Sequence, residues 1–94
     1  MPVTFHEIVK EFEKFCFSEI EKNQPRYSKE FDNTETPLLL DYYKAQNELL
    51  KSILLKMEEY TDRDDYLLLD IEFTKVIKRV LEKFEDNYQP TSDV

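Results

Sequence analysis

The chain of 94 residues carries a formal net charge of −8 and contains no glycine. The lack of glycine excludes phosphate-binding P-loops, dinucleotide-binding turns and EF-hand calcium loops, which all need glycine at fixed positions. The negative charge disfavours direct binding to a nucleic-acid backbone or to an anionic membrane surface. A chain of this length forms one domain as a rule, which we place at residues 1–90, with a disordered tail at 91–94.

The first helix is predicted over residues 4–22. Thr4 followed by Glu7 is a capping box, a pattern typical of a helix start, and Pro25 disfavours helix in the residue before it. Apolar residues between these signals recur at spacings of three and four, so they share one helical face. They are Phe5, Ile8, Val9, Phe12, Phe15, Cys16 and Ile20.

The segment 26–35 is polar and irregular, apart from two aromatic residues. Tyr27 and Phe31 lie four residues apart, which predicts a short extra helical turn at about 27–32 that packs onto the bundle. No part of the chain alternates apolar and polar residues for long enough to predict a strand.

The second helix is predicted over residues 37–60, with Thr36 as its N-cap and Pro37 at its first position. Its apolar residues alternate in steps of four and three, like the seam of a coiled coil. The seam consists of Leu39, Tyr43, Gln46, Leu50, Ile53, Met57 and Tyr60, flanked by Leu38, Tyr42, Ala45, Leu49 and Leu54. Because the apolar arc covers close to half of the helix, we expect this helix to contact both neighbours and to form the spine of the fold. At the centre of the seam, Gln46 either fixes the packing register or reaches a backbone carbonyl or solvent at an opening of the bundle.

The third helix is predicted over residues 64–88, after a break at 61–65 whose Thr and Asp residues suit a helix N-terminus. Its core face consists of Tyr66, Leu69, Phe73, Val76, Ile77, Val80, Leu81, Phe84 and Tyr88. The three helices together predict an all-α fold, namely a three-helix up-down bundle.

Several apolar residues fall outside the inner faces of these helices at 100° per residue. The excess is greatest at the start of the third helix, where Leu67, Leu68, Leu69 and Ile71 make it apolar on all sides. A helix of this kind is usually surrounded. The pattern favours a homodimer that completes a larger bundle, or a stable complex with another protein, over a monomer in which the segment 26–35 and the tail cover these residues.

Acidic residues surround the break between the second and third helices, with Arg63 as the only opposing charge. Three functional interpretations compete with a solvated acidic corner: binding of a divalent cation, the paired acidic motifs of a magnesium-dependent nucleotide pyrophosphohydrolase, and imitation of a nucleic-acid backbone. The solvated corner is favoured, since charge runs usually have that role. The acidic set is Glu58, Glu59, Asp62, Asp64, Asp65 and Asp70.

Catalysis has little support in the sequence. His6 is the only histidine, so no second histidine is present for a metal site or a proton relay. Cys16 is the only cysteine, which excludes an intramolecular disulfide, and we expect its thiol to be buried and inert in the apolar stripe. We predict that the chain is not an enzyme and needs no metal or other cofactor.

The predicted function is therefore that of a non-catalytic protein–protein interaction module, such as an adaptor, inhibitor or assembly factor. The expected partners are a second copy of the chain and another protein, whose surface is basic if the acidic rim takes part. The first alternative is an acidic inhibitor that imitates nucleic acid, and the second is a magnesium-dependent all-α nucleotide pyrophosphohydrolase. No signal-peptide pattern or long apolar run is visible, so we expect a soluble cytoplasmic protein. The residues assigned to the apolar contact are Phe17, Tyr27, Phe31, Leu40, Leu55, Leu68 and Ile71.

Overall fold

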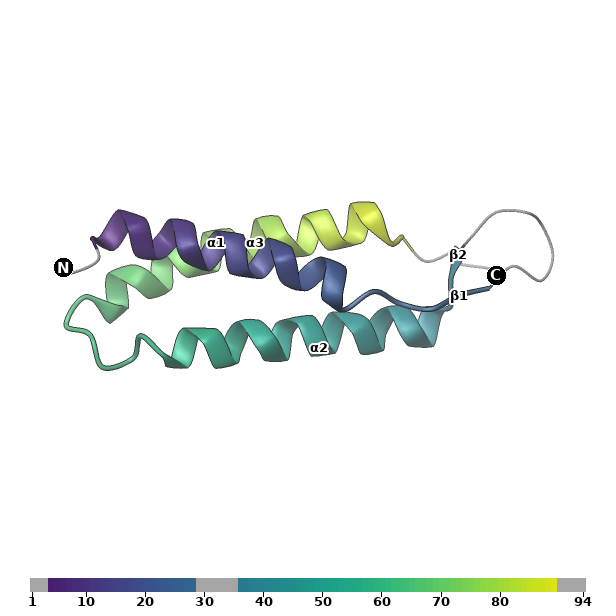
Figure 1. Cartoon of the computed structure of the whole chain (residues 1–94), viewed down its shortest axis with the longest axis horizontal. Helices are drawn as coiled ribbons and strands as arrows, with labels where there is room; N and C mark the ends of the chain where they lie inside the picture. Colours follow the sequence, from purple (N-terminus) through teal and green to yellow (C-terminus); the bar gives the residue numbers. More distant parts are fainter. Residues whose placement is uncertain (1–3, 29–35, 90–94) are drawn as a thin grey trace.

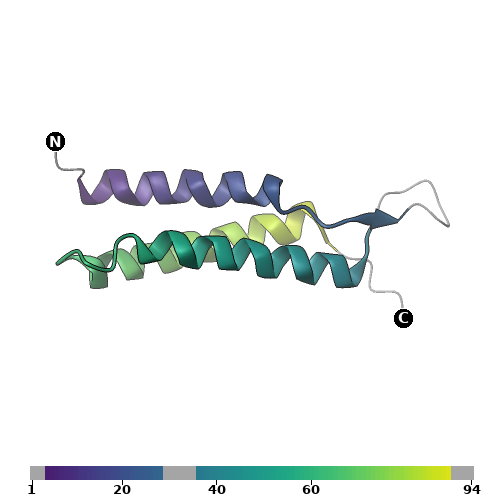
Figure 2. The same cartoon turned by 60° about the horizontal axis from the view of Figure 1, so that its bottom comes forward.

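The computed structural model describes residues 4–28 and 36–89. In this part of the chain, helices α1 (Phe5–Lys22), α2 (Leu39–Glu58) and α3 (Tyr66–Asn87) run side by side along the length of the molecule (Figure 1). Helix α2 runs opposite to α1 and α3, and the view in Figure 2 shows the same arrangement from another side. The all-α three-helix up-down bundle predicted from the sequence is confirmed.

Helix α1 begins and ends at the predicted signals. Thr4 is its N-cap, and the Thr4 hydroxyl oxygen accepts a hydrogen bond of 3.2 Å from the Glu7 backbone N–H, as in a capping box. At the other end, the backbone N–H and the side-chain amide of Asn23 both donate to the Glu19 carbonyl oxygen. These contacts satisfy backbone groups that a helix end otherwise leaves without partners.

The connection between α1 and α2 differs from the prediction. Strand β1 (Tyr27–Ser28) pairs antiparallel with strand β2 (Thr36–Pro37), and the Leu38 N–H donates to the Arg26 carbonyl oxygen at 3.0 Å. The predicted helical turn is therefore wrong at residues 27–28, while residues 29–32, with Phe31, lie outside the described part. The four-residue spacing of two aromatic residues was the whole basis of that prediction, and an extended segment can carry the same spacing.

The predicted start of the second helix is also wrong. Thr36 and Pro37 belong to β2, and α2 has Leu38 as its N-cap, with no side-chain hydrogen bond to its first turn. Proline is tolerated at the end of a short edge strand, because its missing N–H is not needed there. At the turn between α2 and α3, hydrogen bonds between residues three apart replace the helical pattern, so α2 ends at Glu58 and α3 begins at Tyr66.

The core lies between all three helices and contains most of the predicted apolar face of α1 and of α3. At its centre the rings of Phe12 and Phe73 stack, and α1 packs more closely against α3 than against α2. The prediction that the second helix forms the spine of the fold is therefore wrong. The buried apolar residues are Ile8, Phe12, Cys16, Ile20, Tyr42, Ala45, Leu49, Ile53, Met57, Leu69, Phe73, Val76, Val80, Phe84 and Tyr88.

Helix α2 buries a different part of its apolar arc from the predicted seam. Its buried residues are Tyr42, Ala45, Leu49, Ile53 and Met57, which include three of the flanking positions. Leu39 and Tyr43 of the predicted seam are each 51% exposed, and Gln46 and Leu50 are half-buried. Gln46 thus lies at the edge of the core rather than at the centre of the buried face.

The described backbone contains no residue with positive φ and no cis peptide bond. This agrees with the glycine-free sequence, because positive φ is costly for residues that carry a Cβ atom.

Candidate protein-binding surface

The structure places four of the predicted contact residues on the surface. Leu40, Leu55, Leu68 and Ile71 are all exposed, whereas Phe17 is half-buried and packs against the core. The remaining two give no further information, because the side chain of Tyr27 and the whole of Phe31 lie outside what the structure describes.

These residues do not form one patch. Leu40 is in the first turn of α2, and Leu68 and Ile71 are in the first two turns of α3. Because α2 and α3 are antiparallel, their first turns lie at opposite ends of the bundle (Figure 1). Leu55 lines a shallow hollow between α2 and α1, apart from both of these groups.

The apolar pattern of α2 predicts burial for a second set of residues, which the structure leaves exposed or half-buried. Four residues at spacings of four, seven and four form what we call the α2 stripe: Leu39, Tyr43, Leu50 and Leu54. Leu50 is half-buried and the other three are exposed. The spacing of these residues predicts that they share one face of α2. It does not predict whether that face is buried in the core or exposed to solvent.

The α2 stripe lies on the side of α2 that borders α3. On the opposite flank of α2, Lys56 lies over the Phe15 ring of α1 with its Nζ atom 5.4 Å from the ring centroid. At 100° per residue the centre of the stripe is about 130° away from Lys56, with the centre of the buried face of α2 between them. Since α2 has only α1 and α3 as neighbouring helices in the described structure, the stripe follows the boundary with α3.

Helix α3 adds two half-buried residues to this boundary, Ile77 and Leu81. The Arg79 guanidinium pairs with the Glu13 carboxylate of α1 at 2.9 Å, so the flank of α3 that carries Arg79 faces α1. Ile77 and Leu81 lie on the opposite flank, about 180° away. Helices α2 and α3 also make the least extensive contact of the three helix pairs, which leaves the apolar boundary between them open to solvent.

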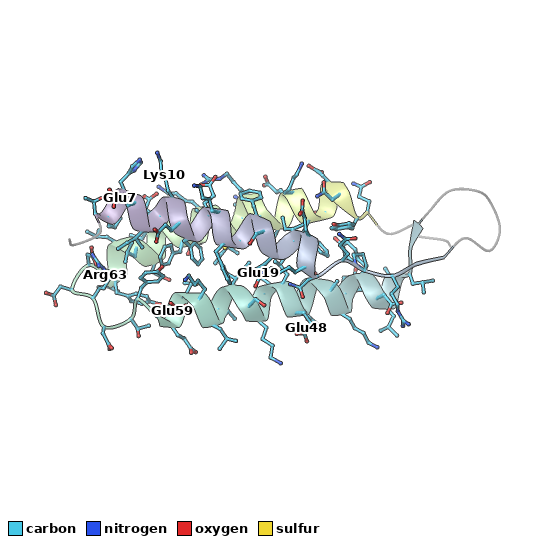
Figure 3. All side chains as sticks on the ribbon, viewed as in Figure 1. Glu7, Lys10, Glu19, Glu48, Glu59 and Arg63 are labelled. Atoms are coloured by element: carbon cyan, nitrogen blue, oxygen red, sulfur yellow. The ribbon has the colours of Figure 1, made fainter. Side chains whose placement is uncertain are left out.

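The predicted acidic residues gather at one end of the bundle, around the turn between α2 and α3. Figure 3 shows Glu59 and Arg63 at this end. The six carboxylates differ in exposure: Glu58, Glu59, Asp62 and Asp64 are exposed, while Asp65 and Asp70 are half-buried. The structure thus keeps four of the predicted six as a solvent-facing acidic end.

Arg63 forms an ion pair with one of these carboxylates, that of Asp65. Its Nε and Nη2 atoms donate to the two oxygens of Asp65 at 2.8 and 3.0 Å, a bidentate pair. The hydrogen bonds from Arg63 hold the pKa of the Asp65 carboxyl below its usual value. Arg63 therefore neutralises the charge of Asp65. It does not pair with the four exposed carboxylates at this end of the bundle.

No cluster of three or more His, Cys, Asp or Glu residues within 4–28 and 36–89 is arranged to hold a metal ion. In those same ranges, no helix has the length and apolar character needed to span a membrane.

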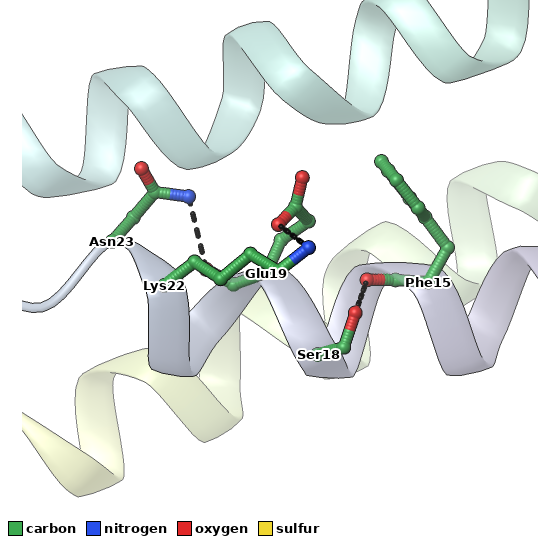
Figure 4. A network of polar contacts seen from close by, with 5 residues as sticks. All are labelled: Phe15, Ser18, Glu19, Lys22 and Asn23. Carbon is green, nitrogen blue, oxygen red and sulfur yellow. Dashed lines mark hydrogen bonds and ion pairs between the residues drawn. The ribbon is translucent and has the colours of Figure 1, made fainter.

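Glu19 is a buried carboxylate that the sequence did not reveal. It is 9% exposed and lies between α1 and α2, where its Oε2 atom has no hydrogen-bond donor. Its charge is opposed by Lys22, whose Nζ atom lies 3.5 Å from Oε2 (Figure 4). The side chain of Lys22 is mostly exposed, so this ion pair is screened by solvent on one side.

Cys16 is buried, as expected from its place in the apolar stripe. Burial, together with the nearby carboxylates of Glu19 and Glu13, raises the pKa of the Cys16 thiol to about 12. The thiol is therefore protonated at neutral pH and unreactive as a nucleophile, because the thiolate is the reactive form.

No protein-family model, no curated protein and no solved structure matches this chain.

Proposed function

We propose that the protein is a non-catalytic interaction module that binds a helix of another protein along the boundary between α2 and α3. The observation that supports this most is the α2 stripe, Leu39, Tyr43, Leu50 and Leu54, in which three of the four apolar side chains are exposed. Apolar side chains on the surface at regular helical spacing are typical of a surface that accepts an amphipathic helix.

The spacing of the stripe supports a helical partner in particular. Steps of four, seven and four keep the side chains on one narrow band of the helix, as in the seam of a coiled coil. A partner helix lying along this band also reaches Ile77 and Leu81 of α3, which are half-buried. Its docking turns the three-helix bundle into a four-helix arrangement, a common architecture for helices of this length.

Tyr43 is the best candidate for an anchor residue. Its ring makes an edge contact with the buried ring of Tyr42, with centroids 5.3 Å apart, yet half of the side chain remains exposed. An aromatic side chain held on one side in this way loses little conformational freedom when a partner covers the other side.

The charge of the surface favours a partner with basic residues. The stripe runs toward the acidic end of the bundle, where Glu58 and Asp62 are exposed. Opposite charge on the partner speeds association and sets the direction in which its helix docks.

The test is affinity capture from a native lysate with the full chain as bait. We expect Tyr43→Glu and Leu54→Glu each to lose a protein that the wild type retains. Lys51→Glu is the matched control, because Lys51 is exposed on the same helix outside the stripe and the substitution also adds negative charge. Equal capture by the stripe variants and the control would contradict the proposal.

A second candidate function is an acidic inhibitor that imitates nucleic acid, supported by the exposed carboxylates at the turn between α2 and α3. A captured protein that duplex DNA displaces, and that Asp62/Asp64/Asp65→Asn fails to capture, would favour this function over the first. Retention of the same protein by that variant would exclude it.

A further inference from the structure

The first two turns of α3 carry an apolar group that the α2–α3 boundary does not include. Leu67, Leu68 and Ile71 are 78%, 60% and 54% exposed, and Leu67 is the most exposed large apolar residue of the described structure. Residues three and four apart are neighbours on a helix, so both leucines lie beside Ile71. We call these three residues the α3 patch.

Opposite charges border the α3 patch at its two ends. Asp64 precedes it in the turn before α3, and Lys78 follows it on the same side of the helix as Ile71, seven residues further along. Both side chains are exposed, and neither forms a salt bridge with any residue in 4–28 or 36–89. In chain order, an acidic residue in the turn before α3 is therefore followed by the apolar α3 patch and then by a basic residue on the same face of the helix.

We infer that this face pairs with the same face of a second copy of the chain, in an antiparallel arrangement about a two-fold axis close to Ile71. Lys78 lies seven residues beyond Ile71 in α3, about 10 Å at 1.5 Å per residue, and Asp64 lies seven residues before Ile71, in the turn that precedes the helix. A two-fold axis at Ile71 brings the turn that carries Asp64 of each copy to the end of the patch at which Lys78 of the other copy lies. The arrangement forms two ion pairs at its ends and buries the apolar group between them.

Residues between the patch and Lys78 suit this pairing. The axis sets Leu68 opposite Thr74 of the other copy and Leu67 opposite Lys75. The Thr74 hydroxyl donates to the Asp70 carbonyl of its own helix at 2.8 Å, which leaves its methyl group free for an apolar contact. Lys75 pairs with Glu72 of its own helix at 3.2 Å, and its methylene chain can cover a leucine.

The charges also select the orientation. A parallel pairing of the same faces sets Asp64 against Asp64 and Lys78 against Lys78, which is repulsive at both ends. An antiparallel pairing is isologous, so one self-complementary face is sufficient for a closed dimer. The inference deepens the proposed role as an interaction module, since it names a second copy as the partner of α3 and leaves the α2 stripe for another protein.

The test is analytical ultracentrifugation of the purified full chain over a range of concentrations at low ionic strength. We expect the mass of the wild type to rise from 11.4 kDa toward that of a dimer. Asp64→Lys and Lys78→Glu should each weaken self-association by about tenfold or more, because each single variant brings two like-charged pairs together. Lys51→Glu, which changes charge outside this face, should associate like the wild type.

Mixing the two single variants provides the decisive result. In an equimolar mixture, the lysine introduced in one chain meets the glutamate introduced in the other, and the unchanged Asp64 and Lys78 meet as in the wild type, so both pairs become attractive. We expect the mixture to recover association close to that of the wild type, which a misfolded variant cannot do. A monomeric wild type at all concentrations, single variants that associate as well as the wild type, or a mixture that stays monomeric would each overturn the inference. No partner protein enters this test, so its failure is distinct from a failure of the helix-binding proposal.

Discussion

The rings of Phe12 and Phe73 stack in the core with their centroids 4.0 Å apart and their planes 27° from parallel. This contact joins α1 to α3, the helix pair that packs most closely. Both rings are fully buried, so each removes a large apolar area from water. The ring pair thus connects two helices that the long α2 segment separates in the sequence.

Replacing Phe12 by alanine should remove this stack and leave a cavity. We expect Phe12→Ala to lower the free energy of unfolding by about 3–5 kcal/mol, measured by urea denaturation followed by circular dichroism. Phe17→Ala is the matched control, because Phe17 is half-buried and the same substitution there should cost much less. Equal losses for the two variants would contradict the described core.

The exposure of the α2 stripe can be measured through stability. Leu54→Ala should change the free energy of unfolding by no more than about 0.5 kcal/mol, because Leu54 is exposed. Leu49→Ala, in the buried face of the same helix, should lower it by about 2–5 kcal/mol. If Leu54→Ala proved as destabilising as Leu49→Ala, the stripe would belong to the core and not to a binding surface.

The buried carboxylate of Glu19 should contribute little to stability. We expect Glu19→Gln to leave the free energy of unfolding unchanged or to raise it by about 1 kcal/mol, since it removes a buried charge that has one solvent-screened partner. Lys22→Gln should instead be destabilising, because it leaves the carboxylate buried without its opposing charge. Urea denaturation at pH 7 measures both, and the reverse order of stabilities would contradict the account.

The raised pKa of Cys16 predicts a loss of stability at alkaline pH. The thiol has a pKa of about 12 in the folded protein, above its value of about 8.5 in an unfolded chain. Between these values the unfolded chain releases a proton that the folded protein keeps, so the free energy of unfolding falls as the pH rises. Between pH 8 and 10.5 the wild type should lose stability more steeply than Cys16→Ala, whose other titrating groups are the same. Equal slopes in chemical denaturation would show that the thiol ionises as readily in the folded protein.

The pair of Arg63 and Asp65 predicts a change in an acid titration. Hydrogen bonds from Arg63 lower the pKa of Asp65, so this contribution to stability is present above the ordinary carboxyl pKa and is lost as the pH falls through the lowered value. Arg63→Gln should raise the pKa of Asp65 toward its ordinary value, as followed by NMR of the carboxyl carbon. Arg26→Gln, which removes an arginine that pairs with Asp41, should leave the pKa of Asp65 unchanged.

The bounds and the buried face of helix α1 could be predicted because the sequence is compatible with only one choice for each. Thr4 and Pro25 bound it, and its apolar residues occupy a single face, so burial and helix ends followed directly. Helix α2 has apolar residues over nearly half of its circumference, and the pattern cannot decide which part of that arc is buried. The structure selects the part around Leu49, because packing against α1 and α3 sets the rotation of α2 about its axis.

The candidate surface was predictable to a similar degree. Leu68 and Ile71 lie far enough from the inner face of α3 that periodicity alone marked them as exposed, as they are. The exposure of Leu39 and Tyr43 depends on how α2 is rotated about its axis. The periodicity of the sequence does not determine that rotation. The strands β1 and β2 are each two residues long, which is too short to show an alternation of apolar and polar residues. Their pairing could therefore not be predicted from the sequence pattern.

The absence of positive φ from the described backbone has a practical consequence for mutagenesis. Every described residue already accommodates a Cβ atom, and none needs the conformational freedom that only glycine has. An alanine scan of residues 4–28 and 36–89 therefore reports on side chains, except at the proline positions. Differences in stability or binding between neighbouring positions of such a scan can be compared directly as a map of the surface.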